Sequence, residues 1–96
     1  MKRPLEILLA KSAQRYLDTQ SQNTQQRILD RLRTVAAEPA NLRFSKPLAG
    51  AGAIRSAHVG GWRILLEVIG DEELRVYSIA PRGQVYQQRR IQRLRH

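Results

Sequence analysis

The segment AIRSAHVGGWRILLEVIGDEELRVYSIAPRGQVY, residues 53–86, decides the fold, because apolar and polar side chains alternate along it between glycine-containing turns. Alternation with a period of two is typical of β-strands that bury one face. Gly60-Gly61 and Gly70-Asp71 mark two tight turns, since glycine readily adopts the positive φ that hairpin turns require. The segment therefore predicts three antiparallel strands in a meander.

The Gly60-Gly61 turn also predicts how the first two strands pair. If the turn has two residues, His58 lies opposite Arg63 on the same face of the sheet. Side chains paired in this way have Cβ atoms about 4.5 to 5.5 Å apart. His58 and Arg63 are therefore expected to be close neighbours.

The same register places Arg55 on the face of Trp62, which is the apolar face of the second strand. An unpaired guanidinium is costly on such a face. We therefore expect a β-bulge between Arg55 and His58, which would return Arg55 to the open face.

The faces of the other strand positions follow from the alternation. Four apolar residues of the second strand are predicted to face the helices: Trp62, Ile64, Leu66 and Val68. In the third strand, residues of one face alternate with residues of the other: Leu74, Val76 and Ser78 with Arg75, Tyr77 and Ile79. Pro81-Arg82-Gly83 is expected to end this strand sharply.

The residues before this segment predict a strand and two helices. Alternation over residues 5–9 indicates a strand, and Pro4 indicates that it lies at a sheet edge. Helical spacing follows over residues 13–17 and 28–36, and Asn23 with Gln26 reads as the cap of the second helix. Pro39 is expected to end this helix, and residues 38–52 to form a loop.

The predicted fold class is α+β, within a single domain of residues 1–96. An N-terminal strand and an antiparallel helix hairpin precede the three-stranded antiparallel meander, which completes a small twisted sheet. Residues 84–96 are expected to form a short C-terminal helix.

The charge of the chain indicates its partners. It carries 17 Lys and Arg against 8 Asp and Glu, a net charge of +9, and 14 of the cations are arginines. Such a field attracts polyanions, and the planar guanidinium binds phosphate in a bidentate manner. Nucleic acid is therefore the favoured partner. No basic amphipathic helix with a broad aromatic face is visible, so we expect no membrane attachment. No run of about 20 apolar residues is present either, so we expect a cytoplasmic location.

Metal and disulfide chemistry are not expected. The chain has no cysteine and only two histidines, His58 and His96. Structural disulfides and thiolate metal sites need cysteines. We expect no cofactor.

Three strings of the sequence resemble the RelE/ParE superfamily of bacterial toxins. They are KPLAGAG (residues 46–52), HVGGWRILLEV (58–68) and VYSIAPRGQVY (76–86), and together with the element order they extend the resemblance over essentially the whole chain. The chain departs from the family pattern at Gly61, Pro81, Gly83 and Gln84, where the family frequently has other residues. These departures leave the arginines of the motifs in place and affect the assignment of a general base.

The resemblance implies a function and a set of site residues. In the ribosome-dependent ribonuclease branch, the positions of Arg63, Arg82 and Tyr86 are implied to hold the scissile phosphate of the messenger and to take part in proton transfer at its 2′-hydroxyl. His58 stands where the family usually has a basic residue. The implied function is that of a RelE-like mRNA endoribonuclease, which acts in the ribosome, inhibits translation and is neutralised by a cognate antitoxin.

The chemistry of RNA cleavage requires the same kinds of group. The 2′-hydroxyl must lose its proton, the charge on the phosphorane must be stabilised, and the departing 5′-oxygen must gain a proton. Two arginines supply the second requirement. Two residues could carry the proton: Tyr86, whose pKa neighbouring cations would lower, and His58, which titrates near neutrality.

Further cations are candidates for RNA binding: Arg55, Arg43, Lys46, Arg89 and Arg90. Ordinary solvated charge is the alternative interpretation for Arg43 and Lys46. Two other functions also remain open from the sequence. One is ParE-like inhibition of DNA gyrase without hydrolysis, and the other is an RNA-binding module that has no catalytic activity.

Overall fold

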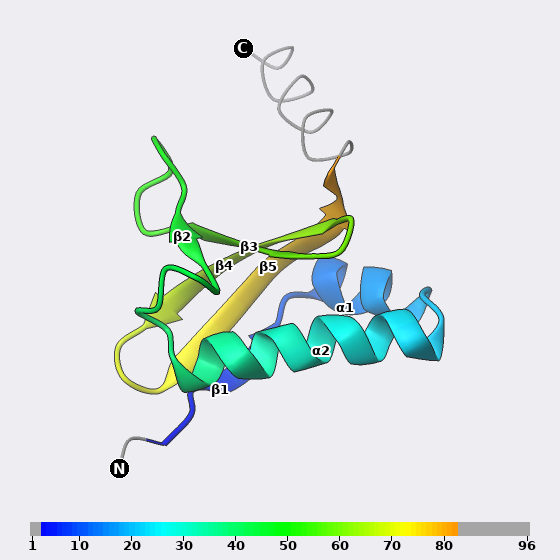
Figure 1. Ribbon diagram of the computed structural model, residues 1–96, viewed down its shortest axis with the longest axis horizontal. Helices are drawn as coiled ribbons and strands as arrows, with labels where there is room; N and C mark the ends of the chain where they lie inside the picture. The colour runs from blue at the N-terminus through cyan, green and yellow to red at the C-terminus, as the bar shows by residue number, and fades with distance from the viewer. Residues whose placement is uncertain (1–2, 83–96) are drawn as a thin grey trace.

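A computed structural model describes residues 3–82 of the chain, which form two helices and a five-stranded sheet. Figure 1 shows the helices lying beside the sheet. The elements follow one another as β1 (Glu6–Leu9), α1 (Lys11–Asp18), α2 (Gln22–Ala37), β2 (Lys46–Pro47), β3 (Arg55–Val59), β4 (Trp62–Ile69) and β5 (Glu73–Pro81). The predicted α+β class is confirmed. The predicted C-terminal helix lies outside the described residues.

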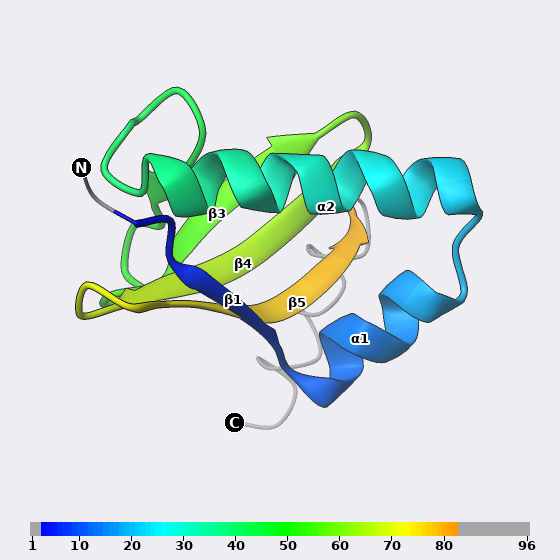
Figure 2. The same ribbon diagram turned by 90° about the horizontal axis from the view of Figure 1, so that it is seen from below.

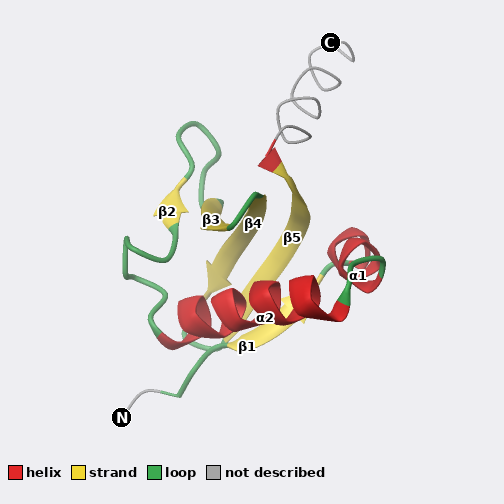
Figure 3. Cartoon of the chain, turned by 45° about the vertical axis from the view of Figure 1, so that its right-hand side comes forward, coloured by secondary structure: helices red, strands yellow, loops and turns green. Residues whose placement is uncertain are grey.

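The sheet has the strand order β1-β5-β4-β3-β2. Strands β3, β4 and β5 form the predicted antiparallel meander, and β1 pairs with β5 in parallel. Strand β2 was not predicted, because it lies within the segment interpreted as a loop. It has only two residues, which pair with Arg55 and Ser56 (Figure 3), so it is too short to produce a recognisable alternation.

Both helices lie on the same face of the sheet, as Figure 2 shows from the helix side. Between the two layers lies a core of apolar side chains, the largest fully buried ones being Ile28, Leu32, Val35, Ile64, Leu66, Leu74 and Val76. We call the opposite side of the sheet the open face, because neither α1 nor α2 covers it. Side chains on that face point away from the core between the two layers.

Strand β1 shows how the alternation sets the two faces. Leu5 is buried just before the strand, and Ile7 and Leu9 pack against the core, whereas Glu6 and Leu8 are exposed. The strand forms one edge of the sheet, as Pro4 indicated. The apolar residues of β1 therefore cover the end of the core.

The N-terminal cap of α2 differs from the prediction. Ser21, in an extended conformation, is the cap residue, and its Oγ accepts the backbone N–H of Thr24 at 3.2 Å. Asn23 lies within the first turn of the helix, so the prediction of Asn23 as the cap was wrong. The helix ends at Ala37, close before Pro39, which confirms the predicted stop.

The expected bulge between Arg55 and His58 was wrong. Strands β3 and β4 pair without interruption from Val59 opposite Trp62 to Arg55 opposite Leu66, so Arg55 stays on the side of the sheet that faces the helices. Its guanidinium donates to Ser45 twice, from Nε to Oγ at 3.0 Å and from Nη2 to the backbone oxygen at 2.9 Å. These bonds satisfy the guanidinium at the edge of the core, so no bulge is needed.

A bulge occurs instead in the pairing of β4 with β5. Leu65 lies opposite Ser78, but the next residue, Leu66, lies opposite Val76, so Tyr77 is the extra residue of β5. The inserted residue changes which side chains face inward beyond it. Ile79 is therefore buried, and Ser78 lies on the open face, in contrast to the regular alternation predicted from the sequence.

Candidate functional site

The site begins with a pair of side chains across the Gly60-Gly61 turn. His58 and Arg63 are register partners on the open face, as the sequence predicted. The Nε–H of Arg63 donates to His58 Nε2 at 3.1 Å. An imidazole that accepts a hydrogen bond at Nε2 is neutral and carries its proton on Nδ1. The hairpin thus holds an arginine against a neutral histidine.

The end of β5 brings Arg82 to the same turn. Its backbone N–H donates to the carbonyl oxygen of Gly61 at 3.1 Å, and Ala80 lies opposite Arg63 in the sheet. The side chain of Arg82 is exposed. Arg82, which is distant in the sequence, therefore meets His58 and Arg63 at one end of the open face.

The surrounding cations affect the titration of His58. Its side chain stays accessible to water, but partial burial lowers its pKa below 6.5, and the charges of Arg63, Arg82 and Lys46 lower it further. Burial and nearby positive charge both disfavour the imidazolium ion. His58 is therefore neutral near neutral pH and able to accept a proton.

The remaining predicted RNA-binding residues lie in different places. Lys46 pairs with Ser56 at the edge of the sheet and is close enough to affect His58. Arg43 is exposed in the loop before β2. Arg55 is bound to Ser45 on the helix-facing side and is not part of the cluster. Three predicted residues, Tyr86, Arg89 and Arg90, lie outside the described residues.

A second group of polar side chains lies further along the open face, and sequence reasoning missed it. The hydroxyl of Tyr77, in the bulge, donates to Glu67 Oε1 at 2.7 Å, and this bond raises the pKa of Tyr77. Arg75 Nε contacts Glu73 Oε2 at 2.6 Å. Only the unpredicted bulge brings Tyr77 beside Glu67. The open face is therefore basic at the Gly60-Gly61 end and mixed in charge beyond it.

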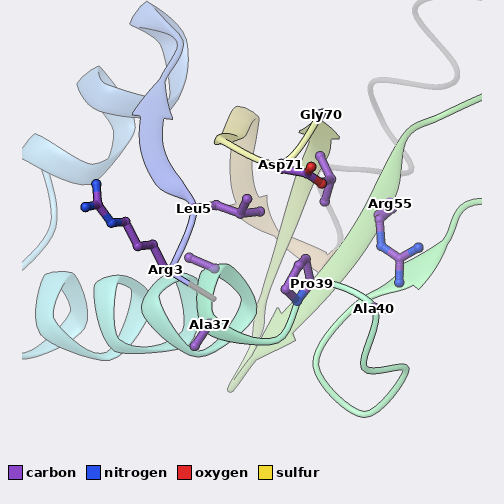
Figure 4. A pocket seen from close by; sticks show the side chains of 10 residues that line it. Arg3, Leu5, Ala37, Pro39, Ala40, Arg55, Gly70 and Asp71 are labelled. Atoms are coloured by element: carbon purple, nitrogen blue, oxygen red, sulfur yellow. The ribbon is translucent and has the colours of Figure 1, made fainter. Parts of the chain in front are cut away.

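A hollow of about 530 Å³ lies at the other end of β4, beside the Gly70 turn. Figure 4 shows it between the end of α2, the start of β1 and that turn, with Arg55 and Asp71 on its rim. None of the residues that the sequence assigned to catalysis lines it. The candidate site is therefore an exposed surface of the sheet rather than this hollow.

Two further observations concern the residues that the structure describes. Among residues 3–82, no group of three or more His, Asp or Glu side chains could hold a metal ion. Within the same range, neither helix is both long enough and apolar enough to cross a membrane.

The sequence was compared with models of known protein families. Residues 7–86 match the model of the ParE toxin of the type II toxin-antitoxin system parDE. The chain belongs to this family. The resemblance to the RelE/ParE superfamily, drawn from the three strings, is thus confirmed, and the chain is a toxin of a type II toxin-antitoxin system.

Several solved structures similar to this ParE-family chain are RelE toxins or their complexes with an antitoxin. The RelBE2 toxin-antitoxin complex of Mycobacterium tuberculosis matches with a TM-score of 0.71 at 20% identity, over 83% of this chain and 100% of that one. The isolated RelE toxin of E. coli matches with a TM-score of 0.69 at 18% identity, over 96% and 99%. The RelE-RelB complex of the archaeon Pyrococcus horikoshii matches with a TM-score of 0.70 at 20% identity, over 84% and 98%. No curated protein matches the sequence. At these identities the structures establish a shared fold.

Proposed function

We propose that this toxin is a ribosome-dependent mRNA endoribonuclease, which inhibits translation and is neutralised by a cognate antitoxin. The observation that carries the proposal is the meeting of Arg63, Arg82 and neutral His58 at one end of the open face. The similar structures support neutralisation by an antitoxin, because several of them are toxin-antitoxin complexes. A net charge of +9 supports RNA as the substrate.

Each side chain of the cluster has a role in this reaction. The 2′-oxygen of the messenger attacks the adjacent phosphorus, the bond from phosphorus to the 5′-oxygen breaks, and a 2′,3′-cyclic phosphate and a 5′-hydroxyl form. Arg63 and Arg82 are fixed cations that stabilise the extra negative charge of the phosphorane. His58 accepts the proton of the 2′-hydroxyl at Nε2. Tyr86 remains a candidate for removing the proton of the 2′-hydroxyl or for donating a proton to the departing 5′-oxygen.

The hydrogen bond between Arg63 and His58 links substrate binding to proton transfer. Nε2 of His58 accepts from Arg63 in the free protein, so its lone pair is occupied. A phosphate attracts the guanidinium more strongly than a neutral imidazole does, because the bond is then between opposite charges. Binding of the messenger therefore draws Arg63 to the phosphate and leaves Nε2 free to accept the proton.

Translation in vitro tests the proposed activity. Purified toxin is added to a reconstituted translation system, and the message is analysed by primer extension. We expect new 5′ ends within codons positioned in the ribosomal A site, and none when the same RNA is incubated without ribosomes. Intact messages in the presence of folded, toxic protein would refute the proposal.

Inhibition of DNA gyrase is the second candidate function, and the match to the ParE toxin model favours it. In that case the toxin would act through contact with gyrase, and the cluster of His58, Arg63 and Arg82 would not cleave RNA. A supercoiling assay with purified gyrase separates the two functions. Loss of supercoiling together with uncut messages would select the gyrase target.

The pH dependence of cleavage can identify the proton carrier. Since burial and the neighbouring cations lower the pKa of His58 from 6.5, the fall of kcat/KM on acidification should be centred below pH 6.5 if His58 is the base. Replacement of His58 by glutamine should remove this acidic limb. The rate of the wild type is divided by the rate of His58→Gln at each pH, because this ratio cancels effects of pH on the ribosome. A rate that instead rises through alkaline pH would assign the base to Tyr86.

A further inference from the structure

Arg27 of α2 contacts the Gly60-Gly61 turn from the helix side of the sheet. Its guanidinium carbon lies 5.7 Å from the centre of the Trp62 ring, a distance typical of a cation–π contact. A Cβ atom added at Gly60 would lie only 2.7 Å from Arg27 Nη2. Gly60 therefore serves two purposes: it adopts a φ of +55° and lets the guanidinium approach the backbone.

Trp62 is also held by α1. Its Nε1–H donates to the hydroxyl of Tyr16 in α1 at 2.8 Å. Trp62 directly follows the turn and lies opposite Val59 in β3 and Pro81 in β5. Figure 2 shows the tip of the β3–β4 hairpin reaching toward the N-terminal half of α2. Side chains from both helices thus fix the residue that anchors the hairpin tip.

The same turn carries the three candidate site residues. His58 precedes Gly60 by two positions, Arg63 follows Gly61 by two, and the backbone of Arg82 is bound to the Gly61 carbonyl. Two adjacent glycines have no side chains with which to hold the turn, and their backbone is the most flexible that a hairpin can have. The position of the turn must therefore be fixed by groups outside it.

We propose that Arg27 is a positioning residue, which fixes the Gly60-Gly61 turn through Trp62 and so sets the spacing of His58, Arg63 and Arg82 on the open face. Its importance for cleavage rests on the proposed function, but its effect on the geometry of the cluster does not. Arg27 is exposed at the surface of α2, so its loss leaves the core intact.

The titration of His58, followed by NMR, tests the positioning role directly. The charges that lower the pKa of His58 are those of Arg63, Arg82 and Lys46, and Arg27 is not among them. A change of this pKa on mutation of Arg27 therefore reports movement of the turn. We expect Arg27→Met to move the pKa of His58 toward 6.5, and Arg33→Met, which removes an exposed charge from the same helix, to leave it unchanged. Comparison with the spectrum of His58→Gln distinguishes the signals of His58 and His96.

A second pair of variants tests the contact from the side of the turn. Gly60 and Gly70 have nearly the same φ, +55° and +57°, but an added Cβ meets Arg27 only at Gly60 and nothing within 4 Å at Gly70. Gly60→Ala and Gly70→Ala should therefore cause similar losses of thermal stability, because both strain the backbone. Only Gly60→Ala should displace Arg27 and alter the titration of His58.

Cleavage provides the functional measurement. A displacement of a catalytic group by about 1 Å can lower a rate by about 100-fold, so we expect kcat of Arg27→Met to fall by about 10- to 100-fold, with KM changed much less. An unchanged pKa of His58 in both Arg27→Met and Gly60→Ala would overturn the positioning role. If the pKa shifts as expected but the wild-type protein cuts no message, the positioning role stands and the proposed ribonuclease function fails.

Discussion

Replacing Arg82 with alanine is expected to abolish growth arrest when the toxin is expressed without its antitoxin. Alanine keeps the backbone N–H that binds the Gly61 carbonyl, and the Arg82 side chain is exposed, so the variant should fold normally. In the proposed mechanism, the variant loses one of the two cations that stabilise the developing phosphorane charge. Removal of one such group typically lowers kcat by about 100- to 1000-fold. Growth curves after induction and primer extension in vitro measure the loss.

Arg75→Ala is the matched control for Arg82→Ala. Arg75 also lies on the open face, is exposed and pairs with Glu73, away from the Gly60-Gly61 turn. Both variants lower the net charge equally, so a purely nonspecific attraction to RNA would weaken to the same degree in each. We expect Arg75→Ala to retain toxicity. Undiminished growth arrest by Arg82→Ala would remove Arg82 from the proposed mechanism.

Leu66→Ala is expected to cause a large loss of stability. Leu66 is completely buried on the helix-facing side of β4, opposite Arg55 and next to the bulge in β5. Truncation of a buried leucine to alanine lowers the free energy of unfolding by about 2 to 5 kcal/mol. Domains of this kind are stable by only about 5 to 15 kcal/mol in total. Urea denaturation followed by circular dichroism measures the change.

Leu42→Ala provides the comparison for Leu66→Ala. Leu42 is the same residue type but is 58% exposed in the loop before β2. Its truncation leaves no cavity in the core, so the urea concentration at the midpoint of unfolding should remain close to that of the wild type. Similar losses for Leu42 and Leu66 would contradict the assignment of the core.

The parts of the fold that depend on local sequence could be predicted. Gly60-Gly61 fixes the register of the hairpin, because a two-residue turn allows one alignment of its strands, and that register brought His58 opposite Arg63. The inward face of β4 followed from alternation, and the end of α2 from Pro39. In each case the deciding residues are close together in the chain.

The features that depend on distant partners could not be predicted. Arg55 remains on the helix-facing side because Ser45, ten residues earlier, accepts two of its hydrogen bonds. The bulge at Tyr77 results from the pairing of β5 with β4, and no glycine or proline stands beside Tyr77 to mark it. Arg27 approaches Gly60 only through tertiary packing. Pattern reasoning has no signal for such contacts.

The candidate site was predictable to the same extent. The pairing of His58 with Arg63 follows from the turn, and the order of the strands in the meander was enough to expect Arg82 at the end of the adjoining strand. The hydrogen bond from Arg63 to Nε2, which makes His58 a neutral acceptor, could be learned only from side-chain geometry. The role of Tyr86 remains a prediction.

The parallel pairing of β1 with β5 has a consequence for the order of folding. Glu6 lies opposite Glu73, so the first strand of the chain finds its partner only after nearly all the others have been made. Closing such a long stretch of chain costs entropy before any contact repays it, which slows folding. During synthesis the first strand must wait beside the ribosome for the last, and Arg82 emerges later still. The toxin therefore acquires its candidate site only after β5 and Arg82 have been made, and nascent chains that stop before them lack it.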